Sequence, residues 1–374
     1  PTDLAPQAAD RGMSRAQRKK LAALLRAKPD NAKLQNLQGT LLVESGKLDA
    51  AIKAFRRAVE HEPDNADFQA NLGGALSGAG RIAEAVAPLE AAVALRPDAR
   101  SARMALARTL VQTGAYDAAA EHAGILAVQC PGDRVVRHLQ AAIQIERRDY
   151  DTAARMLDSV VAEDLQDADA WHNLGTALLG KGAYADAVRC YQSALILRAD
   201  YGPSLLQLGQ AYLGLGRADD AVDAYVRAVE TATDPEAAHN RMVQVLDKAE
   251  QHEVGVQVYH ELLRKNPDDP EALNFLAALL IRAGKESEAL ECLELSVVKN
   301  PDSARPYFML GSQFRKRGEL AKAASFLSQA AERRPVLPDA LFNLGLCQRD
   351  LGHLAESLDS SQRYVELVPD SENG

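Results

Sequence analysis

The chain has 374 residues, of which 47% are hydrophobic, 25% charged and 5% aromatic, and its formal net charge is −9. This composition is ordinary for a folded protein, and the negative charge disfavours general nucleic-acid binding because phosphate repels it. No uninterrupted apolar run of 18 residues is present, which disfavours a membrane span.

The N-terminal part precedes the regular pattern of the chain. Residues 1–13 are predicted to be disordered; they are polar and lack a signal-peptide core, which favours a cytoplasmic protein. Residues 14–31 are predicted to form an N-terminal capping helix, because Leu21, Leu24 and Leu25 share one helical face. The cysteines are widely spaced, without a metal-ligand pattern, and are predicted to be reduced: Cys130, Cys190, Cys292 and Cys347.

A 34-residue period runs through residues 32–371 and divides them into ten repeats, numbered one (32–65) to ten (338–371). Three slots of the proline register hold Leu165, Ala199 and Thr233 instead. A fixed period of this length indicates stacked supersecondary units, each burying apolar surface against its neighbours. Proline marks the register at Pro29, Pro63, Pro97, Pro131, Pro267, Pro301, Pro335 and Pro369.

Each repeat is predicted to be a helix, a glycine turn, a second helix and a proline stop. Position 15 is glycine in eight of the ten repeats, and glycine ends helices in the left-handed conformation. Asp or Asn after the proline can cap the next helix, as at Asn65 and Asp269. The position-15 glycines are Gly46, Gly80, Gly114, Gly182, Gly216, Gly284, Gly318 and Gly352.

Two repeats depart from this pattern. Repeat four has Arg148 at position 15 and lacks the proline, and repeat seven has Glu250 there and Gly255 where most repeats have alanine. Two interpretations remain open for these repeats: a local bend of the helix stack, or sequence drift that the packing tolerates. Pro88 lies inside a second helix and is predicted to kink it.

The repeat resembles the tetratricopeptide repeat, over residues 32–371, and repeat five carries the resemblance most fully. The resemblance implies an all-α fold, a right-handed α-solenoid superhelix of antiparallel helix pairs, whose first helices line a concave groove. Residues 372–374 would form a short tail. The matching residues of repeat five are Trp171, Leu174, Gly175, Gly182, Tyr184, Ala187, Tyr191 and Ala194.

The sequence shows no pattern that indicates catalysis. It has no phosphate-binding G-x-x-x-x-G-K-[ST] loop and no G-x-S-x-G elbow. His138 and His172 are 34 residues apart, which places them on neighbouring groove helices without further metal ligands. We therefore predict a protein that is not an enzyme and has no cofactor, no catalytic residues and no metal site.

The groove is the predicted binding surface, because the resemblance implies that positions 2, 5, 6, 9, 12 and 13 of each repeat face it. At these positions, repeats seven to ten carry a net charge of +3 and repeats one to five a net charge of −2. Aromatic and Arg side chains are common energetic centres of interfaces, and amides can pair with a peptide backbone. The predicted peptide-binding residues are Asn173, Gln207, Gln210, Asn240, Arg241, Gln244, Asn274, Phe275, Arg282, Arg305, Phe308, Met309, Arg315, Lys316, Phe342, Asn343 and Arg349.

These features favour a protein–protein interaction scaffold whose partner is a somewhat acidic protein or peptide segment with apolar anchors. For Phe275, Phe308 and Phe342, packing between adjacent first helices is the alternative to ligand contact. Two other functions stay open. The chain could be the substrate-recruiting region of a larger glycosyltransferase- or sulfotransferase-type enzyme, or a structural protein that self-associates through its C-terminal repeat.

Overall fold

The computed structural model describes residues 21, 23–28 and 30–368, and its chain divides into two compact units, Pro1–Lys181 and Gly182–Gly374. The boundary between the units falls in the turn of repeat five. The predicted disordered segment 1–13, residues 14–20 of the predicted capping helix and the predicted tail lie outside the described residues. Within the capping segment, residues 23–27 are helical and Leu21 is buried.

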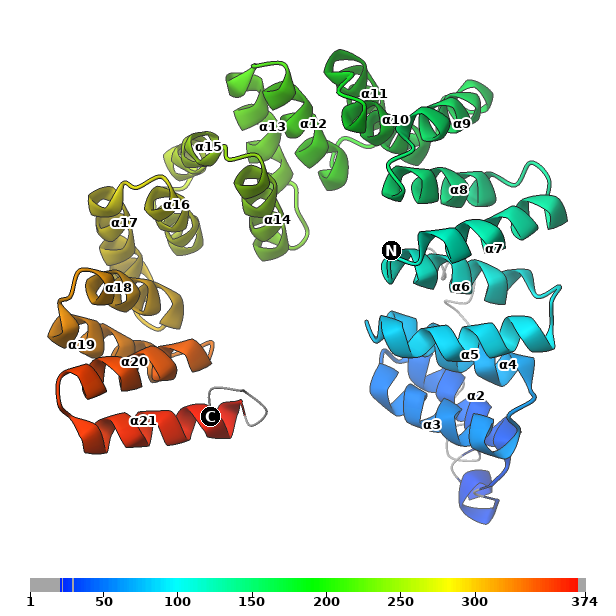
Figure 1. Ribbon diagram of the computed structural model, residues 1–374, viewed down its shortest axis with the longest axis horizontal. Coiled ribbons are helices and arrows are strands. Elements are labelled where there is room, and N and C mark those ends of the chain that lie inside the picture. The colour runs from blue at the N-terminus through cyan, green and yellow to red at the C-terminus, as the bar shows by residue number, and fades with distance from the viewer. Residues whose placement is uncertain (1–20, 22, 29, 369–374) are drawn as a thin grey trace. The chain divides into compact units, whose positions relative to one another are not determined.

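The first unit is a row of helices in which each contacts its neighbours in sequence (Figure 1). The first helices of repeats one to five alternate with second helices, as the repeat pattern predicts. In chain order the helices are α2 (Ala32–Glu44), α3 (Leu48–His61), α4 (Ala66–Gly78), α5 (Ile82–Leu95), α6 (Arg100–Gln112), α7 (Tyr116–Gln129), α8 (Arg134–Glu146), α9 (Tyr150–Glu163) and α10 (Ala168–Gly180).

The second unit continues the alternation, with α12, α14, α16, α18 and α20 as first helices. In Figure 1, α14 and α16 lie on the inner side of this row and α15 and α17 on its outer side. The helices are α11 (Tyr184–Leu197), α12 (Gly202–Gly214), α13 (Ala218–Glu230), α14 (Pro235–Lys248), α15 (His252–Lys265), α16 (Pro270–Arg282), α17 (Glu286–Lys299), α18 (Ala304–Lys316), α19 (Leu320–Ala331), α20 (Pro338–Asp350) and α21 (Leu354–Leu367). The predicted all-α solenoid is confirmed.

The helix ends follow the predicted capping residues. The Asn65 side chain accepts hydrogen bonds from the backbone N–H groups of Asp67 and Phe68, and Asp269 accepts from Glu271 and Ala272. These bonds satisfy backbone donors that the first turn of a helix leaves unpaired. The helix α5 runs through Pro88 without ending there.

Position 15 adopts the left-handed conformation in every repeat, whichever residue occupies it. The eight predicted glycines have φ between 72° and 84°, while Arg148 has φ 62° and Glu250 has φ 54°. A side chain with a Cβ is strained in this region. The turn is therefore imposed by the packing of the two helices that it joins, and glycine makes it easier without being required.

Replacing Arg148 or Glu250 by glycine is expected to stabilise its unit by about 0.5–1 kcal/mol. The relieved left-handed strain is about 1–2 kcal/mol, and the added freedom of glycine in the unfolded chain offsets part of it. Urea unfolding followed by circular dichroism measures the change. Gly284→Ala, which creates the same strain at φ +76°, serves as the control and should destabilise; a loss of stability in both glycine variants would contradict the argument.

Position 4 of several first helices holds a side chain that fastens the preceding loop. Gln69 donates to the carbonyl oxygen of Pro63 at 2.9 Å, and Trp171 Nε1 donates to that of Leu165 at 3.1 Å. Each donor satisfies a loop carbonyl that would otherwise lie at a repeat junction without a partner. The sequence analysis did not identify this device.

Repeat seven packs differently from its neighbours. Its second helix α15 contacts α13 of the previous repeat more extensively than it contacts its own partner α14. Position 4 of this repeat is His239, which is buried and whose Nδ1 lies 2.9 Å from the Tyr259 hydroxyl oxygen. The predicted irregularity of repeat seven therefore appears as a local change of helix contacts.

Candidate binding surface

The predicted groove residues lie on first helices, and all but one are in the second unit. They occupy α12, α14, α16, α18 and α20. Asn173 is the exception, because it lies on α10 in the first unit, where its Nδ2 is 3.5 Å from His138 Nδ1. The candidate surface is therefore considered within the second unit alone.

Two of the predicted residues are buried. Asn274 is 2% exposed, and its Oδ1 accepts a hydrogen bond from Ser296 Oγ at 2.8 Å. Phe275 is 8% exposed and stacks on the rings of His239 and Tyr259, with centroids 4.7 Å and 5.8 Å away. The prediction that these two side chains face a ligand is wrong, because Asn274 is enclosed within repeat eight and Phe275 between repeats seven and eight.

Three of the predicted cations form ion pairs within the unit. Arg282 lies 3.4 Å from Asp247, and Arg349 lies 2.9 Å from Asp350. Arg305 contacts Glu271 at 3.3 Å and also Glu236, two repeats away, at 3.0 Å. Glu236 occupies position 1 and was not counted in the predicted charge of the groove, so the positive surplus is smaller than predicted.

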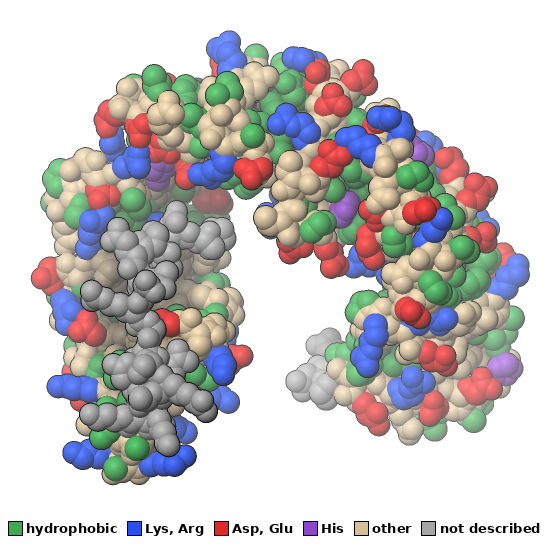
Figure 2. Space-filling view, turned by 180° about the vertical axis from the view of Figure 1, so that it is seen from behind, with side chains coloured by type: hydrophobic (Ala, Val, Ile, Leu, Met, Phe, Trp, Pro, Cys, Tyr) green, Lys and Arg blue, Asp and Glu red, His purple; other side chains and the backbone are tan. Residues whose placement is uncertain are grey.

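Four cations on the first helices of the second unit have no ion pair among the described residues: Arg241, Lys248, Arg315 and Lys316. Arg315 donates a hydrogen bond through Nη1 to Asn343 Oδ1 at 2.7 Å, and the other three side chains are exposed. Figure 2 shows Lys and Arg side chains interspersed with Asp and Glu over the visible face.

The remaining predicted residues are accessible to different degrees. Phe308 and Met309 are half-buried, and Phe342 is 36% exposed beside Tyr364. Phe342 and Phe308 thus keep surface that a ligand could contact, unlike Phe275. The amides of Gln207 and Gln210 are half-buried on α12, and those of Asn240 and Gln244 are exposed on α14.

A cavity of about 240 Å³ opens between α12 and α14, and the sequence analysis did not identify it. The linker between α13 and α14 forms one wall, in the stretch where Thr233 replaces the repeat's proline. The absence of proline at this position was the only sequence signal that could have indicated the cavity, but its effect on the cavity depends on how the linker folds. The lining residues are Asp200, Tyr201, Gly202, Pro203, Leu206, Ala228, Thr231, Ala232, Thr233, Asp234, Ala238 and Arg241.

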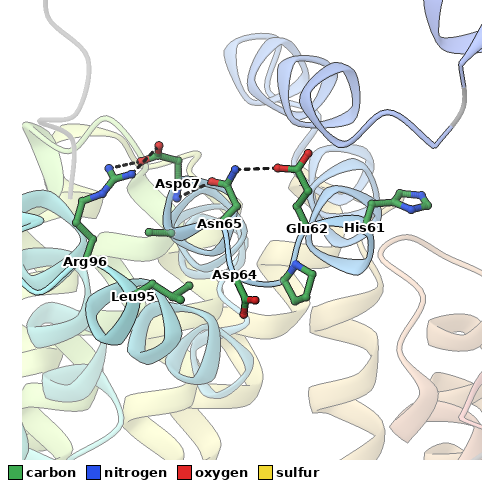
Figure 3. Close-up of a pocket in the computed structure, with 9 residues that line it drawn as sticks. His61, Glu62, Asp64, Asn65, Asp67, Leu95 and Arg96 are labelled. Carbon is green, nitrogen blue, oxygen red and sulfur yellow. Dashed lines mark hydrogen bonds and ion pairs between the residues drawn. The ribbon is translucent and has the colours of Figure 1, made fainter.

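The first unit has a larger, polar cavity of about 610 Å³, lined by residues of repeats one and two (Figure 3). Arg96 makes two contacts with the Asp67 carboxylate, at 2.7 Å and 3.1 Å, and Asn65 donates to Glu62 at 3.1 Å. The hydrogen bonds that Arg96 donates to the Asp67 carboxylate raise the pKa of Arg96. Among the polar side chains that line the cavity, Arg96, Asp67, Asn65 and Glu62 are therefore already paired with one another.

His138 and Asp167 form a second polar cluster in the first unit, with His138 Nε2 2.9 Å from Asp167 Oδ2. Burial opposes ionisation of Asp167, but hydrogen bonds from the Ala170 N–H and from His138 keep the pKa of this carboxyl below its usual value. Among the described residues, no group of three or more His, Cys, Asp or Glu side chains is arranged to hold a metal ion.

The last helix, α21, has an uncovered apolar face. Leu354 is 68% exposed and Leu358 is 61% exposed, whereas Leu48 and Ile52, at the same two positions of repeat one, are half-buried and buried. The self-association alternative depends on this face and stays a prediction. Over the part of the chain that the structure describes, no helix combines the length and apolarity needed to cross a membrane.

Comparison with known families identifies the repeat. Models described as tetratricopeptide repeat match residues 3–60, 36–89, 75–134, 166–234, 248–313 and 308–372. No curated protein matches the sequence.

Solved structures with a similar arrangement have low sequence identity. The TPR protein YrrB, described as having an unusual peptide-binding site, is 17% identical over 51% of this chain and 98% of its own, with a TM-score of 0.37. Yeast Tom70 is 14% identical over 90% of this chain and 92% of its own, with a TM-score of 0.36. The human IFIT1 dimer is 16% identical over 75% and 76%, with a TM-score of 0.44.

Proposed function

This chain belongs to the tetratricopeptide-repeat family, and from that premise we propose that it is a non-catalytic scaffold that binds a protein segment along the first helices of its second unit. Repeats of this family suggest a protein-interaction role in general. The particular surface and the class of partner are inferred here from the side chains of the unit itself.

The observation that carries the proposal is the set of unpaired cations Arg241, Lys248, Arg315 and Lys316 on two first helices, α14 and α18. Cations without internal partners attract opposite charge, and complementary charge raises association rates and selects partners. An acidic segment is therefore the favoured partner. Arg282, Arg305 and Arg349 are expected to contribute less to binding an acidic segment, because the segment would have to displace the carboxylates with which they are already paired.

Apolar and amide groups accompany these cations. Phe308, Met309 and Phe342 present partly exposed apolar surface on α18 and α20. Such side chains supply the hydrophobic part of a contact, while the amides on α12 and α14 can donate to and accept from an extended backbone. The expected ligand is an acidic segment with one or two apolar anchors.

Selection of random 12-residue peptides by display on the whole protein tests this proposal. We expect the selected peptides to be rich in Asp, Glu and apolar residues. Their Kd, measured by fluorescence anisotropy, should rise at least about tenfold in the variant Arg241→Glu/Arg315→Glu/Lys316→Glu, since three exposed contacts of about 0.5 kcal/mol each give such a factor.

A matched triple variant controls for the change of net charge. Arg227→Glu/Arg264→Glu/Lys322→Glu reverses three exposed cations on the second helices α13, α15 and α19. Its Kd for the same peptides should stay close to that of the wild type. Equal weakening in both variants, or unchanged affinity in the first, would rule out the proposed surface.

A further inference from the structure

We infer that the cavity between α12 and α14, called here the α12–α14 pocket, holds one aliphatic side chain of the bound segment, with an acidic residue of that segment beside Arg241. The inference rests on the proposed function and specifies its anchor. The pocket was not part of the predicted surface; of its lining, only Arg241 was a predicted binding residue.

The floor of the pocket is apolar and rigidly packed. Leu206, Ala228 and Ala238 line it and are at most 8% exposed. Pockets for complete small ligands usually measure about 300–1,000 Å³, and this one, at about 240 Å³, is smaller. Its size and lining therefore suit a single aliphatic side chain better than a cofactor.

Repeats six and seven join at a shifted position. α13 ends at Glu230 and α14 begins at Pro235, so the four-residue linker 231–234 starts one residue earlier than the 34-residue register gives, and it lines the pocket together with the start of α12. Tyr201, just before α12, is held by the guanidinium of Arg198, 4.4 Å from its ring centroid. Small side chains of the linker and of α14, Ala232 and Ala238 among them, line the pocket, and Thr233 stands where most repeats have proline.

Charges are unequally placed around the pocket. Asp200 and Asp234 precede α12 and α14, and Asp234 Oδ1 accepts from the Ala237 N–H at 3.0 Å. Arg241 is seven residues further along than Asp234, which corresponds to about 10 Å along a helix. One end of the pocket is therefore acidic, and the other carries an unpaired guanidinium.

This polarity defines the ligand more closely. A distance of about 10 Å is spanned by about three residues of extended chain. The favoured segment has a basic residue and an acidic residue about three positions apart, with the aliphatic anchor between them. A segment with acidic residues at both ends would meet Asp200 and Asp234 with like charge, which disfavours it.

Methyl NMR with defined peptides tests the pocket directly, using the whole chain with labelled Leu and Ala methyl groups. The probes are 12-residue Gly/Ser peptides with a central Lys-Leu-Ser-Glu, Lys-Ser-Ser-Glu, Lys-Leu-Ser-Lys or Glu-Leu-Ser-Glu. We expect the first to shift the methyl signals of Leu206 and Ala238 and to bind about tenfold more tightly than the other three.

Two variants separate the apolar and the charged contributions. Ala232→Phe fills the pocket from the linker and should remove the preference for Leu over Ser; Ala249→Phe, at the end of α14 and outside the pocket, is its control. Arg241→Glu should reverse the preference, so that Lys-Leu-Ser-Lys binds more tightly than Lys-Leu-Ser-Glu. Arg241 is exposed, so this variant keeps the test valid if Ala232→Phe fails to fold.

The outcomes distinguish the pocket from the scaffold. Display-selected peptides could lose affinity on charge reversal of Arg315 and Lys316 but bind Ala232→Phe as they bind the wild type. That result would overturn the inferred role of the pocket and leave the proposed scaffold function intact. If the Leu206 and Ala238 methyl signals do not respond to any probe, the pocket is also overturned. If display selects no peptide at all, the proposed function itself fails.

Discussion

Replacing Gly73 by alanine is expected to destabilise the first unit by about 1–3 kcal/mol, which is the usual cost of forcing an extra carbon into a packed core. A Cβ on Gly73 would lie 2.5 Å from Leu89 Cγ and 3.2 Å from the Ala85 carbonyl oxygen. Leu89 is fully buried on α5, so it has no free space into which to move. The change is measured by urea unfolding followed by circular dichroism.

The neighbouring residue supplies the control. A Cβ on Gly74 would meet nothing within 4 Å, although it lies in the same helix α4. Gly74→Ala should stabilise the unit by about 0.5–1 kcal/mol, because alanine is the better helix former. The double variant Gly73→Ala/Leu89→Ala should recover part of the loss through coupling between touching residues. Equal shifts in Gly73→Ala and Gly74→Ala would mean that the close contact has no energetic effect.

Acidification is expected to loosen repeats seven and eight through His239. Burial lowers the pKa of His239 below its usual value of 6.5. The unfolded chain then binds the proton first, so the stability from the neutral ring is complete above about pH 6.5 and falls as the pH drops below it. Hydrogen exchange followed by mass spectrometry, at pH 7.5 and pH 5 with correction for intrinsic rates, should show faster opening of α14 to α16 at the lower pH.

The groups around His239 explain why burial, and not the nearby carboxylates, determines the direction of its pKa shift. Tyr259 contacts the ring through its hydroxyl, and burial raises the pKa of Tyr259, so this hydroxyl stays neutral. Glu236 and Asp269 act in the opposite direction and favour the protonated ring. The guanidinium of Arg305, on α18, lies 5.5 Å from the Phe275 ring centroid. Its ion pairs with Glu236 and Glu271 partly neutralise these carboxylates, which weakens the attraction of Glu236 for a protonated His239.

His239→Gln removes the titrating ring and should flatten the pH dependence of exchange in α14 to α16. At neutral pH it should cost about 1 kcal/mol through the lost ring stacking with Phe275. His260→Gln changes an exposed histidine on the same unit and should leave the pH dependence unchanged. A pH dependence that persists in His239→Gln would assign the acid sensitivity to carboxylates instead.

Much of the fold could be predicted from the sequence, because its information is local and repeated. The helix pairs, the turn glycines and the caps Asn65 and Asp269 all follow from residues close in sequence. Even Arg148 and Glu250 keep the left-handed turn, since the flanking helices determine its geometry. The turn therefore extends to these two positions, where the sequence departs from the glycine pattern and did not predict it.

The candidate site was predicted less well, because its character depends on contacts between distant residues. Arg305 pairs with Glu236, 69 positions away, and no spacing within one repeat indicates that pair. Phe275 occupies groove position 6 of repeat eight and Phe342 the neighbouring position 5 of repeat ten, yet the first is enclosed and the second is partly exposed.

The sequence by itself determined the repeat, the family, the all-α class and the helices that could carry a binding surface. Only the tertiary structure decided which of their side chains are available. Periodicity reports how often a residue type recurs on a helix face. Burial, ion pairing and cavity shape depend on how the faces of adjacent helices pack. At repeat seven, the shifted linker 231–234 and the buried His239 change this packing.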